Sequence, residues 1–156
     1  MGYLMRRNLT GWLLVSIQLI LLLLLVFAPL YHSFSNSLAQ QIIGLVLIII
    51  GLAAGFIAAR NLGNALTPTP VPKSDSTLKR AGLYKRIRHP IYTSVMLIAI
   101  GILLERPAVS TIILSVITFL FFFMKSTYEE RLLNERFGDY PEYRKKTGRF
   151  WPKLKL

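Results

Sequence analysis

The stretch that decides the fold is His89–Met124, HPIYTSVMLIAIGILLERPAVSTIILSVITFLFFFM. It holds two apolar runs, Ile91–Leu104 with 14 residues and Pro107–Met124 with 18, and only Glu105 and Arg106 separate them. Two such runs with so short a polar break predict a tight helical hairpin. We expect its first helix to begin at the His-Pro pair, because proline suits the first helical turn. The shortness of that helix suggests that it starts inside the interfacial layer.

Two longer apolar runs precede the hairpin, Leu9–Leu30 and Leu38–Ala59. Each exceeds the roughly 20 residues that an α-helix needs to cross a hydrocarbon core of about 30 Å. The chain has 156 residues, 53% of them hydrophobic, which allows one domain and is too apolar for an ordinary soluble one. We therefore predict an all-α polytopic membrane protein, a single membrane domain over residues 1–156, with about four transmembrane helical segments.

A cleaved signal peptide is the alternative for the first run. Arg6 and Arg7 would form its basic region, and Ser37-Leu38-Ala39 resembles a cleavage site. The apolar run is longer than the usual core of a signal peptide, which favours a retained helix.

The charges predict an orientation. The net charge is +12, and the cations lie between and after the apolar runs, which favours a membrane surface over a nucleic-acid partner. With the N-terminus in the cytoplasm, the inside segments carry every Lys and Arg except Arg106, which is 18 of 19, and the outer loop Tyr31–Ser37 carries none. The positive-inside rule then places both termini and the loop from Asn61 to about Arg88 in the cytoplasm. That membrane would be the inner membrane of a bacterium or the endoplasmic reticulum of a eukaryote.

The cytoplasmic parts have distinct compositions. Thr67–Pro72, TPTPVP, predicts a stiff polyproline-like stretch, and Lys79–Pro90, KRAGLYKRIRHP, is strongly basic. The tail from Lys125 continues the last hairpin helix as a cytoplasmic helix, and Gly138 is a plausible stop. Beyond it, aromatic and basic residues alternate, which is typical of a segment in the headgroup region.

Several classes of chemistry are excluded or disfavoured by composition. Cysteine is absent, so disulfides, thiolate metal sites and a cysteine nucleophile are excluded. With only two histidines, one of them His32 alone in the outer loop, we predict no metal site. Nucleotide-binding glycine motifs and hydrolase motifs are also missing.

Polar clusters flank the hairpin at its two cytoplasmic ends. One is Arg88–Tyr92, RHPIY, and the other is Tyr128–Arg131, YEER. The hairpin should bring them together at the membrane surface, where ionisable residues tend to be functional or paired. The alternative is that Arg88 and His89 anchor to lipid phosphates while the glutamates form a solvated helix face.

The two clusters also carry a resemblance. GLYKRIRHPIY (Gly82–Tyr92), an apolar hairpin, and YEERLLNERFGDYPEY (Tyr128–Tyr143) together resemble the isoprenylcysteine carboxyl methyltransferase and phospholipid N-methyltransferase superfamily of integral membrane enzymes. The resemblance covers about half of the chain. Ser94 departs from it, because the family pattern has glycine there, and a hydroxymethyl group narrows any close backbone approach.

The resemblance implies an S-adenosylmethionine-dependent methyltransferase whose acceptor is a lipid or a lipidated small molecule. Residues 1–60 would supply two transmembrane helices, and residues 61–156 would form the catalytic core. Arg88 would pair with a carboxylate, Glu130 with the ribose hydroxyls or the ammonium group, and aromatic or apolar side chains would cover the adenine. The implied cofactor-binding residues are Tyr84, Arg88, His89, Pro90, Tyr92, Glu130 and Leu133, and the implied catalytic residues are Arg88, Glu129 and Tyr92.

Two rival functions fit part of the same sequence. Membrane sterol reductases, which use a nicotinamide cofactor, share a similar RHPxY, but they show Asn and Gly-Glu where this chain has Ile91 and Ser94-Val95. The second rival is a non-catalytic membrane protein on the same scaffold, and Ser94 is the residue that supports this interpretation. Among single residues, Glu129 could pair with Lys125 four residues earlier. Interfacial packing is the plainer interpretation of Tyr140, Tyr143 and Trp151, and a helix-surface pair that of Arg131 with Glu135.

Overall fold

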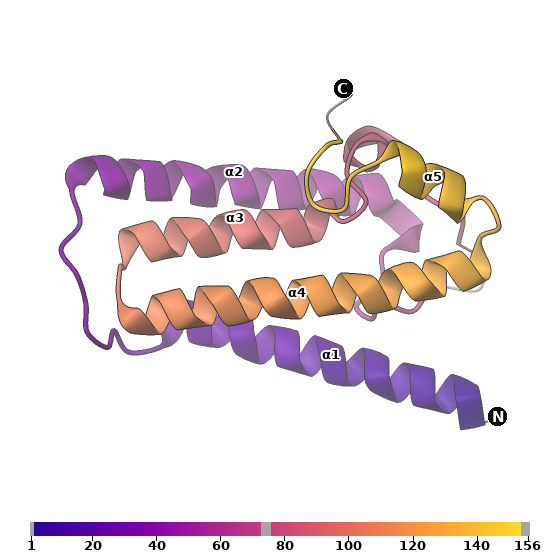
Figure 1. The fold of residues 1–156 in the computed structure, drawn as a ribbon, viewed down its shortest axis with the longest axis horizontal. Coiled ribbons are helices and arrows are strands. Elements are labelled where there is room, and N and C mark those ends of the chain that lie inside the picture. Colours follow the sequence, from indigo (N-terminus) through magenta and orange to yellow (C-terminus); the bar gives the residue numbers. More distant parts are fainter. Residues whose placement is uncertain (1, 73–75, 154–156) are drawn as a thin grey trace.

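The regular elements of the described residues are all helices, as predicted (Figure 1). The structure is a computed structural model that describes the backbone of residues 2–72 and 76–153 and the side chains from Arg7 onward. The Arg6 side chain and residues 73–75 of the predicted cytoplasmic loop lie outside it. The elements are α1 (Gly2–Phe27), α2 (Leu38–Leu62), the 3₁₀ turns η1 (Gly63–Ala65) and η2 (Gly82–Lys85), α3 (Pro90–Glu105), α4 (Val109–Arg136) and α5 (Tyr140–Lys146).

Three helical segments of the described chain are long and apolar enough to cross a membrane: Arg7–Phe27, Leu38–Ala65 and Val109–Arg136. The fourth predicted segment, α3, is a shorter apolar helix of 16 residues that begins at Pro90, as expected. At about 1.5 Å per residue it spans roughly 24 Å, less than the hydrocarbon core of about 30 Å. α4 runs past the apolar run to Arg136, which confirms that the tail continues this helix.

α2 and α3 lie against each other with their backbones in close approach (Figure 1). A Cβ atom on Gly51 of α2 would lie 2.8 Å from the Ser94 carbonyl oxygen, and one on Gly44 would lie 2.8 Å from that of Gly101. Small residues let two helices approach in this way, and dispersion contacts and weak polar contacts then hold the pair together in lipid. This packing fixes the start of α3, and with it the first polar cluster.

Arg106, the one cation outside the predicted cytoplasmic set, lies at the opposite end of the bundle. Arg106, in the hairpin turn, donates from Nη1 to the Val26 carbonyl at 2.5 Å and from Nη2 to the Ala28 carbonyl at 3.5 Å. Val26 lies in the last turn of α1 and Ala28 directly follows the helix, where backbone carbonyls carry partial negative charge that a cation stabilises. Arg106 therefore ties the hairpin turn to α1.

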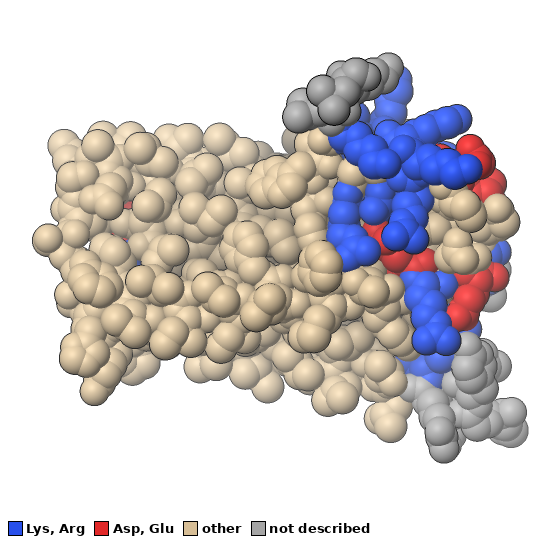
Figure 2. Space-filling model, viewed as in Figure 1, with Lys and Arg blue, Asp and Glu red and all other residues tan. Residues whose placement is uncertain are grey.

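The surface divides into a long uncharged body and a charged end. Figure 2 shows the Lys, Arg, Asp and Glu side chains of this view gathered almost entirely at the end that carries α5. Along the body, many large apolar side chains are exposed, among them Leu13, Leu23, Ile49, Phe56, Val116 and Leu120. Lipid would cover this surface, since contiguous apolar patches of this size are not left in water.

Candidate functional site

The hairpin brings its two polar clusters into direct contact at the charged end. The Tyr92 hydroxyl donates to Glu129 Oε2 at 2.6 Å, and Arg88 Nε lies 2.8 Å from Glu130 Oε1. His89 lies between the two glutamates, with Nε2 3.3 Å from Glu130 Oε1 and Nδ1 3.6 Å from Glu129 Oε2. The prediction that the clusters meet is confirmed.

Glu130 is the centre of a buried ionic cluster. Its side chain is 5% exposed and that of Arg88 is 7% exposed. Arg149 Nη2 lies 3.2 Å from Glu130 Oε2, and Arg144 Nε lies 3.7 Å from the same atom. A buried carboxylate needs such partners, because an unpaired charge at this depth would cost several kcal/mol.

Arg88 also holds the C-terminal segment in place. Its Nη1 donates to the carbonyls of Thr147 at 2.5 Å and Arg144 at 3.3 Å. The backbone repeats the attachment, since the amide of Arg88 donates to the Gly148 carbonyl and that of His89 to the Arg149 carbonyl. Apart from those of the Arg88 guanidinium, these contacts join backbone groups. The docking of the tail on the first cluster therefore depends little on side-chain identity.

His89 is buried and stacks on Tyr92, with ring centroids 5.2 Å apart and an interplanar angle of 2°. Burial alone lowers the pKa of His89, but its contacts with Glu129 and Glu130 outweigh burial and raise that pKa above the ordinary value of 6.5. The two carboxylates therefore favour the protonated, positively charged form of the imidazole.

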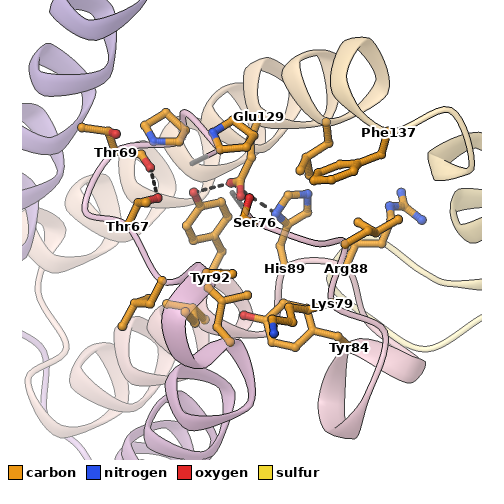
Figure 3. A pocket seen from close by; sticks show the side chains of 18 of the residues that line it. Thr67, Thr69, Ser76, Lys79, Tyr84, Arg88, His89, Tyr92, Glu129 and Phe137 are labelled. Carbon is orange, nitrogen blue, oxygen red and sulfur yellow. Dashed lines mark hydrogen bonds and ion pairs between the residues drawn. The ribbon is translucent and has the colours of Figure 1, made fainter. Parts of the chain in front are cut away.

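A cavity of about 280 Å³ opens beside this cluster (Figure 3). Of the residues assigned from the resemblance, six line it: Tyr84, Arg88, His89, Tyr92, Glu129 and Leu133. Pro90 and Glu130 do not. Figure 3 shows Tyr92 and His89 directed at Glu129. Glu129 therefore presents its carboxylate to the cavity. Glu130 lies outside the lining and contacts Arg88 and His89.

Sequence reasoning missed one wall of the cavity. The stretch Thr67–Pro72, interpreted as a stiff connector, contributes Thr67, Pro68, Thr69, Pro70 and Pro72 to the lining. It packs toward α1, where a Cβ on Gly11 would lie 3.1 Å from Thr69 Cβ. A polyproline segment has no hydrophobic periodicity, so no pattern indicated which surface it would cover.

Two polar side chains at the membrane end of the cavity were also missed. Lys125 Nζ donates to Gln18 Oε1 of α1 and lies 5.4 Å from the centre of the Tyr92 ring. Both side chains line the cavity. The sequence offered Lys125 as a partner of Glu129 four residues later, yet the Lys125 ammonium donates its hydrogen bond to Gln18. Gln18 itself could have indicated this part of the site, since a polar residue in the middle of an apolar run is costly and tends to be functional.

Tyr140 and Tyr143 are buried and line the cavity, whereas Trp151 is exposed. The Tyr143 hydroxyl donates to the Tyr84 carbonyl at 2.7 Å, and burial raises the pKa of Tyr143 to about 12. The Tyr140 hydroxyl is fully buried and has no hydrogen-bond partner among the described residues. A buried hydroxyl without a partner is costly, so Tyr140 offers an unused polar group to a ligand.

Ser94, the departure from the family pattern, does not line the cavity. Its hydroxyl donates to the Ile91 carbonyl at 2.6 Å, and a Cβ on Gly55 of α2 would lie 2.8 Å from it. The small residue at position 94 therefore serves the contact between α2 and α3, where Gly55 leaves room for the hydroxymethyl group. The rival interpretation of a non-catalytic scaffold therefore loses the support that Ser94 gave it.

Arg131 pairs with Glu135 at 3.2 Å on the exposed face of α4, as expected.

Comparison with known proteins gives concordant matches. A family model described as phospholipid methyltransferase matches residues 39–140. A probable protein-S-isoprenylcysteine O-methyltransferase of Oryza sativa subsp. indica is 32% identical over 155 residues, covering 90% of this chain and 80% of the relative. The protein-S-isoprenylcysteine O-methyltransferase of Saccharomyces cerevisiae is 34% identical over 123 residues, covering 74% of this chain and 51% of the relative.

A solved structure shares the fold. The structure of the eukaryotic intramembrane Ras methyltransferase ICMT (isoprenylcysteine carboxyl methyltransferase) superposes with a TM-score of 0.66 at 23% sequence identity. The match covers 97% of this chain and 52% of that one, so this chain spans about half the length of the solved structure and of the yeast relative.

Proposed function

Because this chain belongs to the phospholipid methyltransferase family and is a membrane methyltransferase, we propose that it transfers the methyl group of S-adenosylmethionine to a lipidic acceptor at the cytoplasmic face. The observation that carries the proposal is that both polar clusters line one cavity. Glu129 lies on its wall, as does Tyr140, whose hydroxyl has no hydrogen-bond partner among the residues that the structure describes. A cavity of about 280 Å³ is near the lower end of the roughly 300 to 1,000 Å³ of small-molecule sites.

The side chains of the cavity match the groups of the donor. Glu129 suits the ammonium group or the ribose hydroxyls, and the cationic side chains of Arg88 and Lys79 suit the carboxylate. Tyr84 and Phe137 offer aromatic surface to the adenine. The buried Tyr140 hydroxyl, which has no partner among the described residues, would gain one. When bound, the donor supplies a methyl group on a sulfonium, which is electrophilic without further activation.

The residues of this chain would therefore act mainly by positioning and by excluding water. Tyr92 and His89 hold the Glu129 carboxylate in one orientation. The stretch Thr67–Pro72 covers the cavity with a backbone that has little freedom to move. No protein nucleophile is needed, in keeping with the absence of cysteine.

The acceptor that the comparisons favour is the carboxylate of a prenylated cysteine, since the curated relatives are named for isoprenylcysteine. Lys125, buried at the membrane end of the cavity, offers a positive charge to such a carboxylate. A carboxylate is already ionised near neutral pH and needs no base. A phospholipid amine must first lose a proton, so its methylation would become faster as the pH rises.

The test uses the full chain in detergent with methyl-labelled S-adenosylmethionine and either N-acetyl-S-farnesylcysteine or phosphatidylethanolamine. We expect label in the farnesylcysteine as a base-labile methyl ester, formed at a rate that is flat around neutral pH. Stable N-methyl label in the phospholipid would instead assign an amine acceptor. Binding of NADPH without binding of S-adenosylmethionine would support a reductase and overturn the proposal.

Matched variants address the site itself. Glu129→Gln should weaken donor binding about tenfold or more, since a charged hydrogen bond contributes roughly 1.5 to 3 kcal/mol. Glu142→Gln, on the surface of α5 and paired with Lys145, should bind the donor as the parent does. Equal affinity in both variants would remove Glu129 from the donor site.

A further inference from the structure

A second cavity, of about 370 Å³, lies at the charged end beneath α5. Arg88 lines both cavities, and the other basic residues of the second are Arg144, Lys145, Arg149 and Lys153. Its remaining lining residues are uncharged. The methyl-transfer proposal makes no use of this cavity beyond the shared Arg88.

The charges around this cavity do not balance. Arg88, Arg144 and Arg149 share the carboxylate of Glu130, and Lys145 pairs with Glu142 at 2.7 Å. Lys153 donates to the Lys145 carbonyl, which is neutral. Among the described residues, five cations of the lining against two paired carboxylates leave an excess of three positive charges, which favours an anionic ligand.

The wall of the cavity reaches the level at which the apolar body ends. The guanidinium of Arg149 lies 4.8 Å above the ring of Phe123, an exposed residue at the end of the apolar part of α4, and donates to the Thr127 hydroxyl at 3.0 Å. Trp151, two residues later, is exposed. Figure 2 shows Lys and Arg side chains directly bordering the uncharged body. Arginine and tryptophan at such a boundary are typical of the headgroup layer.

We propose that this cavity binds the phosphate group of an anionic phospholipid, whose acyl chains lie along the apolar face beside Phe123. Guanidinium groups pair with phosphate in a bidentate manner, and two lysines add charge at the rim. A lipid is favoured over a soluble phosphoester because Arg149 joins the cavity to a lipid-facing ring. The proposal rests on the membrane fold and is independent of the methyl donor.

The test uses Trp151 as a reporter. The chain has two tryptophans, so the Trp12→Phe variant keeps Trp151 as its sole tryptophan. In neutral detergent micelles at about 0.15 M salt, where charges are screened beyond roughly 8 Å, phosphatidylglycerol should change the Trp151 fluorescence saturably and phosphatidylcholine should not. Adding Lys145→Gln with Lys153→Gln should weaken this binding about tenfold. Both lysines are exposed, so their removal should leave the thermal unfolding of the protein unchanged.

The matched control adds Lys85→Gln with Arg86→Gln, which removes two exposed cations outside the cavity. It should bind phosphatidylglycerol as the parent does, and equal weakening in both double variants would reduce the effect to general surface charge and overturn the proposal. The absence of any saturable response to phosphatidylglycerol would also overturn it. A saturable response to soluble glycerol phosphate without lipid would reassign the cavity to free phosphoesters.

Discussion

Arg88 and Glu130, 42 residues apart in the sequence, form an ion pair with an Nε–Oε1 distance of 2.8 Å, and each side chain is less than 10% exposed. The pair joins the start of α3 to α4, and the remaining donors of Arg88 hold the tail at Thr147. The residue that the sequence suggested as a ligand contact is thus also a structural link between three segments of the site.

Arg88→Lys should therefore lower both stability and donor affinity. A lysine cannot supply the Glu130 and Thr147 contacts together, because it lacks the planar fork. We expect a loss of about 1.5 to 3 kcal/mol in stability from the lost charged hydrogen bonds, seen as a lower melting temperature in detergent. We also expect a higher Kd for S-adenosylmethionine, measured well below that temperature. Arg86→Lys is the control. Unchanged stability and affinity in Arg88→Lys would contradict both roles.

Tyr140 and Tyr143 make a paired prediction. Tyr140→Phe removes a hydroxyl without a partner among the described residues, so the ligand-free protein should be as stable as the parent, while donor binding weakens by up to about tenfold. Tyr143→Phe removes the bond to the Tyr84 carbonyl and should cost about 1 kcal/mol of stability. Thermal unfolding with and without donor separates the two. Destabilisation by Tyr140→Phe in the absence of donor would argue that its hydroxyl is already used.

His89 predicts a pH dependence of stability. Contacts with Glu129 and Glu130 raise its pKa in the folded state above 6.5, despite the opposing effect of burial. Its contribution to stability is therefore fully present below about pH 6.5 and is lost as the pH rises through the folded-state pKa. The melting temperature should fall over that range, and His89→Gln should flatten the fall while His32→Gln should not. If the melting temperature of His89→Gln falls with pH by the same amount, groups other than His89 cause the pH dependence.

The proposed orientation can be tested because the chain has no cysteine. Ser35→Cys lies in the loop between α1 and α2, and Lys85→Cys lies in η2 at the charged end; both positions are exposed. A membrane-impermeant maleimide should label Ser35→Cys from outside the cell and Lys85→Cys only in inverted vesicles. Labelling of both variants from the same side would overturn the orientation.

The sequence by itself determined the membrane class, the hairpin and the meeting of its two polar clusters. Apolar run length is a local property, and in lipid it leaves a helix as the favoured structure. Once two helices are joined by the short break at Glu105 and Arg106, their far ends must lie together, so the meeting of the cluster around Arg88 with the cluster around Glu129 and Glu130 followed from chain geometry.

Only the tertiary structure decided which glutamate faces the cavity and what encloses it. Glu129 and Glu130 differ by about 100° around α4, and the packing of α4 against α1 and α3 sets that rotation. The wall formed by Thr67–Pro72 and the burial of the Tyr140 hydroxyl depend on contacts between segments far apart in the chain. Neither feature leaves a periodic pattern in the sequence. The positions of a polyproline stretch and of a single buried tyrosine are set by tertiary contacts that form only when the chain folds.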